Sequence, residues 1–187
     1  MRIVRALAVL FTAMMTALMF GGPASATTIG NHGGWLAVAL ASQGCAPVAM
    51  EGTVAASGSP VTVSNTFFPG TCSGGLAITV SGGSFTYVGG TWDGNATLPA
   101  VFSMTSPAPC SYSATIPARL YNGTNSSRPY PLNNHLQLEF DTTAVLTKIS
   151  GSFLCPSTTN MVFDAVYQVR GWNSSTNLYD RTMTIAP

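Results

Sequence analysis

Charged side chains are scarce in this sequence of 187 residues, because Asp, Glu, Lys and Arg make up only 7% of it, against about 25% in ordinary globular proteins. Outside Arg2 and Arg5 at the N-terminus, five basic side chains face six acidic ones. A nearly neutral surface does not attract phosphate groups, so we expect neither a nucleic-acid partner nor binding to anionic membranes. Little charge repulsion opposes self-association of such a chain.

The residues that enzymes use most are also rare. The sequence has two histidines, His32 and His135, and it contains neither a G-x-S-x-G nor an H-E-x-x-H motif, which disfavours an esterase or a zinc protease. Glu139 and Asp141 are two residues apart, so they share a strand face and could serve as the carboxylate pair of a hydrolase. A simpler interpretation is that they form the solvated face of that strand. We therefore expect no enzymatic activity and no catalytic residue.

Clusters of metal ligands are missing as well. The closest two cysteines, Cys45 and Cys72, are 27 residues apart, whereas structural zinc sites use closely spaced pairs. Asp93 and Asn95 are typical of a turn, and two oxygen ligands are too few for a calcium loop. The sequence thus predicts no metal and no cofactor.

One long apolar run is present, and no second one follows it. Arg2 and Arg5 precede the apolar residues Ala6–Phe20, and the small residues Ala24–Ala26 come after them. This order is that of a secretory signal peptide with its cleavage site, and about 15 apolar residues are fewer than the roughly 20 that a membrane-spanning helix needs. We expect residues 1–26 to be a bacterial signal peptide. The mature chain should then be secreted, extracellular or associated with the cell surface, without a transmembrane segment.

The expected mature chain, residues 27–187, has 161 residues, which suits a single domain. All four cysteines lie in it: Cys45, Cys72, Cys110 and Cys155. An even number of cysteines in an oxidising compartment predicts two disulfides. A hairpin turn near Gly58 would place residues whose numbers sum to about 116 opposite each other, which puts Cys45 beside Cys72. The spacing favours this pair together with Cys110–Cys155, while the other two connectivities remain open.

Apolar and polar residues alternate in short runs separated by Gly, Ser, Asn and Pro, which is typical of half-buried strands. About ten or eleven strands are predicted, near Trp35–Leu40, Val48–Ala55, Val61–Phe68, Leu76–Ser81, Ser84–Gly89, Leu98–Met104, Tyr112–Tyr121, His135–Asp141, Val145–Phe153, Met161–Gly171 and Leu178–Ile185. The best helix candidate, Asp141–Ile149, is rich in Thr and β-branched residues and is better explained as a bend followed by a strand. Pro117 lacks an amide donor, so its strand should lie at an edge or contain a bulge. We expect an all-β, disulfide-linked antiparallel sandwich with immunoglobulin-like character.

Four aromatic residues are candidates for ligand binding because they lie at strand ends or in loops: Trp92, Tyr130, Trp172 and Tyr179. Secreted sugar-binding domains stack pyranose rings on such side chains, and nearby amides can bind the hydroxyl groups. The candidate amides are those of Asn95, Asn122, Asn125 and Asn173. The competing interpretation is that these aromatics pack in the core or cap strands. Tyr130 belongs to the long segment Asn122–Asn134, which we expect to be a flexible excursion.

A pattern of cysteines and strands carries a resemblance to a known family. The pattern consists of Cys45, Gly52–Val54, Val61–Phe67, Cys72, Cys110–Ile116, a strand run into Cys155, Phe163–Val169 and Thr184–Pro187. In these segments the chain resembles small secreted actinobacterial β-proteins of unknown function, which are similar in turn to the alkane-oxidation protein activators of pseudomonads. The resemblance implies an exported, non-enzymatic β protein at or beyond the cell surface. For some relatives it implies a role in growth on hydrophobic substrates or in the surface matrix.

These observations favour an exported, non-enzymatic protein that acts at the cell surface or in the extracellular matrix through structural or adhesive contacts. Its partners would be envelope or matrix components, or further copies of itself. The alternative is a carbohydrate- or lipid-binding module that holds a glycan or a hydrophobic ligand with its exposed aromatics. A secreted hydrolase that uses Glu139 and Asp141 is the third hypothesis.

Overall fold

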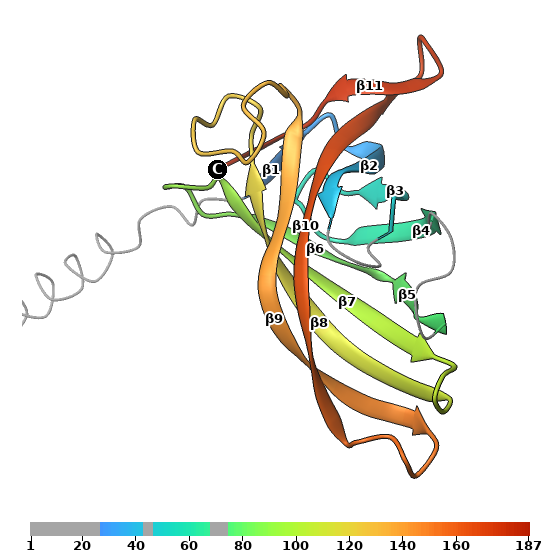
Figure 1. Ribbon diagram of the computed structural model, residues 1–187. Coiled ribbons are helices and arrows are strands. Elements are labelled where there is room, and N and C mark those ends of the chain that lie inside the picture. Colours follow the sequence, from blue (N-terminus) through green and yellow to red (C-terminus); the bar gives the residue numbers. More distant parts are fainter. Residues whose placement is uncertain (1–26, 43–46, 68–74) are drawn as a thin grey trace, which may run out of the picture.

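A computed structural model describes residues 27–42, 47–67 and 75–187 of the chain, and these ranges form β-strands without any α-helix (Figure 1). The strands are β1 (Thr28–Gly30), β2 (Gly33–Ser42), β3 (Ala49–Val54), β4 (Val61–Phe67), β5 (Ala77–Val80), β6 (Gly82–Tyr87), β7 (Gly94–Met104), β8 (Cys110–Tyr121), β9 (Leu136–Gly151), β10 (Thr158–Asn173), β11 (Leu178–Thr182) and β12 (Thr184–Ala186). Within the described ranges, no helix is both long and apolar enough to cross a membrane. The predicted all-β class is confirmed.

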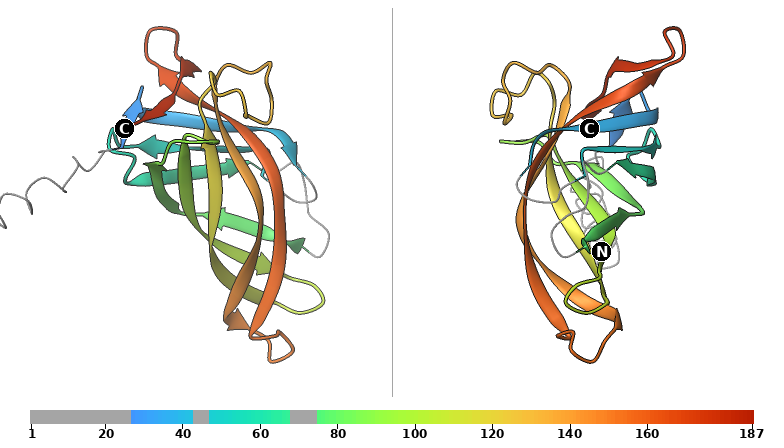
Figure 2. Two further views of the ribbon diagram at one scale, coloured as in Figure 1. Left: turned by 90° about the vertical axis from the view of Figure 1, so that its left-hand side faces the viewer. Right: turned by 45° about the vertical axis from the view of Figure 1, so that its right-hand side comes forward.

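Eight strands follow one another around a closed ring, in the order β2-β3-β4-β6-β7-β8-β9-β10. The ring closes because residues 158–169 of β10 pair with β9 while residues 165–171 pair with β2. Figures 1 and 2 show the resulting barrel, in which the long strands curve around a common interior. The prediction of an immunoglobulin-like sandwich is therefore corrected to a single closed barrel. Alternation of residues shows where strands lie, but it does not show that the first and last strands of a sheet pair with each other.

The barrel interior is filled by alternate side chains from each strand. Along β7 the residues from Ala96 to Phe102 are buried and exposed in strict alternation. The largest fully buried side chains come from several strands and include Trp35, Phe85, Phe102, Tyr112 and Tyr167. Aromatic rings meet in this interior, for instance Phe140 and Tyr167, whose ring centroids are 5.8 Å apart in an edge-to-face arrangement.

Strand β9 is continuous where the sequence predicted a strand, a bend and a second strand. It pairs with β10 at every residue from Leu136 to Thr147, so the bend predicted within Asp141–Ile149 is wrong. The Thr and Val residues of this segment suit extended backbone, and pairing with β10 keeps them extended. Instead of bending at one point, β9 curves smoothly along its length (Figure 1).

The short strands β1 and β12 form a separate two-stranded sheet, which brings the beginning and the end of the described chain together. Ile29 and Ile185 lie opposite each other in this sheet, and both are buried. Asn122 ties the sheet to the segment after β8, because its side-chain amide donates to the Ile185 carbonyl at 2.8 Å and accepts from the Ile185 amide at 2.8 Å.

The segment Asn122–Asn134, predicted to be a flexible excursion, is held against the outer face of β9 and β10. Gln137 accepts a hydrogen bond from the Tyr130 amide at 3.0 Å and donates to the Tyr130 carbonyl at 2.8 Å. Gln168, which lies opposite Gln137 in the ladder, donates to Asn133 Oδ1 at 2.8 Å. Both glutamines are buried by this loop although they face outward from the barrel.

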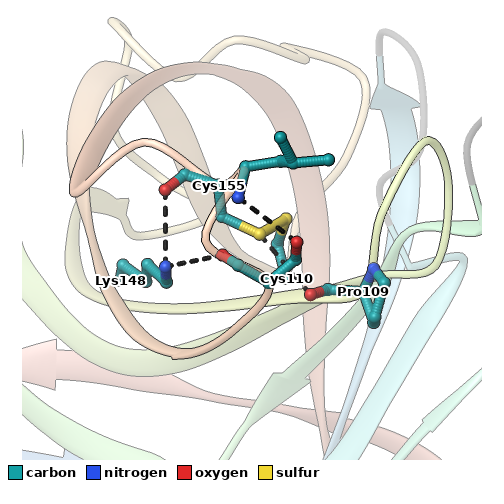
Figure 3. The surroundings of a disulfide bond; sticks show 6 residues. Pro109, Cys110, Lys148 and Cys155 are labelled. Carbon is teal, nitrogen blue, oxygen red and sulfur yellow. Dashed lines mark hydrogen bonds between the residues drawn. A yellow bond between two sulfur atoms is a disulfide. The ribbon is translucent and has the colours of Figure 1, made fainter.

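A disulfide joins Cys110, the first residue of β8, to Cys155 in the β9–β10 connection (Figure 3). The sulfur atoms are 2.02 Å apart and the Cα atoms 6.0 Å apart, so this predicted pair is confirmed. The predicted partners Cys45 and Cys72 lie outside the described residues, as does the predicted signal peptide, and their pairing stays a prediction. The predicted turn near Gly58 is confirmed, because it connects β3 to β4. These two strands pair from Val54–Val61 next to the turn to Ala49–Phe67 at the other end.

Candidate functional site

The outer face of β7, β8 and β9 is hollowed into an open groove of about 360 Å³. Its polar and aromatic lining consists of Trp92, Asn95, Thr97, Arg119, Glu139, Asp141 and Thr142. Trp92 belongs to the β6–β7 connection, and the other residues lie on the three strands. Asn95, Arg119 and Glu139 form one row across the sheet, since Arg119 pairs with Asn95 on one side and with Glu139 on the other.

The groove lies where β8 and β9 lose their regular pairing. Arg119 pairs with Glu139 and Ser113 pairs with Thr147, but the residues between these two pairs are not matched, and the interval is two residues longer in β9 than in β8. Pro117 lies in this interval and has no amide hydrogen to donate to β9. The prediction of an edge or a bulge at Pro117 is thus confirmed as a break in the ladder. Because the two strands are not tied together here, the outer surface has room for the groove.

Trp92 forms one wall of the groove, and two neighbours fix its ring. The indole Nε1 donates to Asn95 Oδ1 at 2.9 Å, and the guanidinium carbon of Arg119 lies 4.9 Å from the ring centroid, which is a cation–π distance. Because Asn95 uses its oxygen for Trp92, its amide nitrogen keeps two hydrogens that can be offered to a ligand.

Two carboxylates flank the same guanidinium. Arg119 Nη1 lies 3.5 Å from Glu139 Oε2 and 3.6 Å from Asp141 Oδ2, while the Tyr121 hydroxyl donates to Glu139 Oε2 at 2.9 Å. Burial raises the pKa of Tyr121, the Glu139 carboxylate raises it further, and Arg119 opposes the rise. Tyr121 is therefore a protonated donor at neutral pH, and it holds the Glu139 carboxylate in position.

This arrangement suits a ligand that is rich in hydroxyl groups. Carboxylate oxygens accept hydrogen bonds from hydroxyls, the guanidinium and the Asn95 amide donate to them, and the indole offers an apolar face. A phosphate or sulfate would meet two carboxylates and one cation, so the groove disfavours anions. Glu139 and Asp141, the pair considered for a hydrolase, do lie in the same groove, where both are ion-paired with Arg119.

The four aromatic residues predicted to bind a ligand are not brought into one site. Trp92 lies in the groove, whereas Trp172 and Tyr179 pack edge to face on the β10–β11 hairpin with their ring centroids 5.0 Å apart. The Tyr179 hydroxyl donates to the Glu51 carboxylate. Tyr130 is held through its backbone by Gln137. Of these four residues, Trp92 is therefore the one that lines the groove, where it contacts the polar side chains of Asn95 and Arg119.

Sequence reasoning missed Arg119, the residue at the centre of the groove. A signal for it exists, because Arg119 is the only charged residue between Asp93 and Arg128. In the fold this lone cation lies beside two carboxylates of β9, Glu139 and Asp141. Their position opposite Arg119 follows from strand pairing, which the sequence does not show.

Among the described residues, no three His, Cys, Asp or Glu side chains gather as a metal ion would require. Comparison with known proteins gives no match, because no protein-family model, no curated protein and no solved structure matches the chain. The resemblance to secreted actinobacterial β-proteins therefore stays a prediction, and function has to be inferred from the groove itself.

Proposed function

We propose that this protein is exported, is not an enzyme, and makes adhesive contacts outside the cell by binding neutral carbohydrate in the Trp92 groove. The observation that carries the proposal is the assembly of an indole, a guanidinium, an amide and two carboxylates around one open groove. Stacking on an aromatic face combined with hydrogen bonds to hydroxyls is how proteins distinguish sugars from other polar ligands.

The polar lining supports a carbohydrate over a lipid in this groove. An acyl chain would cover Arg119, Glu139 and Asp141 without replacing their hydrogen bonds to water, which is unfavourable. The hydroxyl groups of a sugar can replace these hydrogen bonds to water. The two carboxylates also favour a neutral glycan over a sulfated or phosphorylated one.

Export is part of the same proposal. The Cys110–Cys155 disulfide is typical of proteins in oxidising compartments, and the predicted signal peptide would deliver the chain to one. Fractionation of the native cells into cytoplasm, wall, matrix and medium tests this part. Recovery of the protein mainly in the cytoplasm, with Cys110 and Cys155 reduced, would contradict it.

The carbohydrate site is tested by titrating neutral polysaccharides and their sulfated counterparts into the purified protein while recording heat or tryptophan fluorescence. We expect a neutral glycan to bind, and we expect Trp92→Ala to weaken that binding at least tenfold, because the stacking surface is lost. Trp172→Ala is the matched control, since Trp172 is also a partly exposed tryptophan but does not line the groove. Equal losses in the two variants, or no loss in Trp92→Ala, would overturn the proposal.

The hydrolase hypothesis is tested on the same glycans by measuring new reducing ends. We expect none to appear, and we expect Glu139→Gln to weaken binding because it removes a charged acceptor from the Arg119 pair. Steady release of reducing ends that stops in Glu139→Gln would show that the groove is an active site instead.

A further inference from the structure

Two large apolar side chains project from the tip of the β9–β10 hairpin. Phe153 is 91% exposed and the next residue, Leu154, is 69% exposed. Figures 1 and 2 show that this hairpin extends beyond the rest of the barrel, at the end opposite to the β8–β9 loop. Single exposed apolar residues are ordinary, but two adjacent ones at the tip of a projecting hairpin require an explanation.

The tip is braced. The disulfide attaches Cys155 to Cys110, and the Ser152 amide donates to the Pro109 carbonyl at 2.9 Å. Lys148 Nζ donates to the Ser152 carbonyl at 2.7 Å and to the Cys155 carbonyl at 3.4 Å (Figure 3). These contacts hold the two apolar side chains in solvent, so presenting them to a partner costs little further ordering of the chain.

The same end of the barrel is almost free of charge. We call it the distal end and define it as residues 96–118 and 142–163, which form the β7–β8 hairpin and the outer part of the β9–β10 hairpin. Lys148 is the single Asp, Glu, Lys, Arg or His residue in these two segments. Its ammonium group is turned toward backbone carbonyls beside the disulfide (Figure 3).

We propose that the distal end binds lipid bilayers by inserting Phe153 and Leu154 into the boundary between headgroups and acyl chains. Apolar side chains gain free energy by leaving water at this depth. Charged groups around an insertion point oppose it because they must be dehydrated, and the distal end has one, which is already bonded to carbonyls. The absence of a basic cluster favours a zwitterionic bilayer over an anionic one.

The size of the tip argues for a lipid surface and against a protein partner. A large side chain buries roughly 150–250 Å² when it is fully covered, so Phe153 and Leu154 together offer a few hundred Å² at most. A stable protein–protein interface requires about 1,200–2,000 Å². A bilayer needs no matching surface and accepts a narrow, convex tip.

The test is flotation of the processed protein with phosphatidylcholine vesicles, after mass spectrometry has shown that residues 1–26 are absent. We expect the protein to float with the vesicles, and we expect Phe153→Ser and Leu154→Ser each to reduce the bound fraction at least tenfold. Phe153→Trp should retain binding, and bromine-labelled acyl chains should quench its added fluorescence.

The matched control is Leu132→Ser, because Leu132 is fully exposed in the loop at the opposite end of the barrel. This variant should bind vesicles as the unaltered protein does. Failure of the unaltered protein to float would overturn the proposal, as would equal losses in Leu132→Ser and Leu154→Ser. A concentration-dependent dimer that disappears in Phe153→Ser would assign the tip to a second copy of the chain instead. Glycan binding by the groove is independent of each of these outcomes.

Discussion

The two ends of strands β8, β9 and β10 differ in charge although they belong to the same strands. The distal end contains one charged residue, Lys148. The other end, residues 119–141 and 164–182, which we call the apical end, contains eight Asp, Glu, Lys or Arg residues. It includes three residues of the groove, Arg119, Glu139 and Asp141. A strand's backbone pairing is therefore compatible with two quite different surfaces along its length.

The two ends are also held together by different means. A covalent bond between Cys110 and Cys155 fixes the distal connections. Side-chain hydrogen bonds from Gln137 and Gln168 fix the apical loop. A disulfide acts mainly on the unfolded chain and is insensitive to pH and salt, whereas buried polar groups must all find partners to be stabilising. The two ends should therefore respond differently to mutation and to pH.

Removing the disulfide should have the largest effect on stability. The bond closes a loop with a sequence separation of 45 residues, for which chain entropy gives about 4 kcal/mol. We expect the double variant Cys110→Ser, Cys155→Ser to lose about this much in urea unfolding. An unchanged unfolding midpoint under non-reducing conditions would show that the distal connections are held by their hydrogen bonds alone.

Shortening Gln137 should loosen the apical loop and leave the distal end unchanged. Gln137→Ala removes both partners of the Tyr130 backbone, and we expect a cost of about 2 kcal/mol for the unpaired groups. Amide hydrogen exchange should accelerate in residues 122–134, with no change around Cys155. Faster exchange at both ends, or at neither, would contradict the separation of the two ends.

Alkaline pH should affect the apical end through Tyr179, with the smallest effect of the three. Burial raises the pKa of Tyr179 to about 12 from an ordinary 10.0, and the hydrogen-bonded Glu51 carboxylate adds to the rise. Because the folded state keeps this proton longer than the unfolded state does, the contribution of Tyr179 is intact below pH 10 and is lost as the pH rises to about 12.

In Glu51→Gln, the pKa of Tyr179 should fall but remain above 10.0, since burial is the larger cause. The variant should accordingly lose less stability than the unaltered protein between these pH values. The difference in phenolate absorption between each protein and its Tyr179→Phe counterpart measures the pKa of Tyr179, because it removes the signal of the other five tyrosines. A Tyr179 pKa that is unchanged in Glu51→Gln would refute the role of the carboxylate.

Much of the strand content could be predicted from local sequence, because alternation records which residues face the interior. Val61–Phe67 and Ala77–Val80 lie where period two placed them. Closure of the barrel could not be predicted, since β2 and β10 come from opposite ends of the chain and no local signal marks their pairing. The bend expected in β9 was wrong because pairing with β10 keeps the segment extended, which its Thr and Val residues also favour.

The groove could be predicted in its parts but not as a whole. Trp92 was one of several candidate aromatic residues and Asn95 one of several candidate amides, and Glu139 and Asp141 were noted as a carboxylate pair. Asn95, Arg119 and Glu139 lie side by side because β7, β8 and β9 pair in this register. The sequence does not show the register of strand pairing, so it could not bring these residues together. Gln137 and Gln168 were missed for the same reason, because each looks like an ordinary polar residue on a solvated strand face until a loop covers it.

The unmatched interval between β8 and β9 has a consequence for how this barrel can change. In a regular ladder, inserting one residue moves every later side chain to the opposite face. Between Arg119–Glu139 and Ser113–Thr147 the two strands already differ in length, but each pairs at every position of this interval with its other neighbour, β8 with β7 and β9 with β10. A change made in β9 and β10 together keeps their mutual pairing, and the irregular interval can take up the altered offset between β8 and β9. The Phe153–Leu154 tip could thus be exchanged for that of another barrel as a whole β9–β10 hairpin while Asn95, Arg119 and Glu139 keep their alignment, which makes this interval a natural splice point for building chimeras.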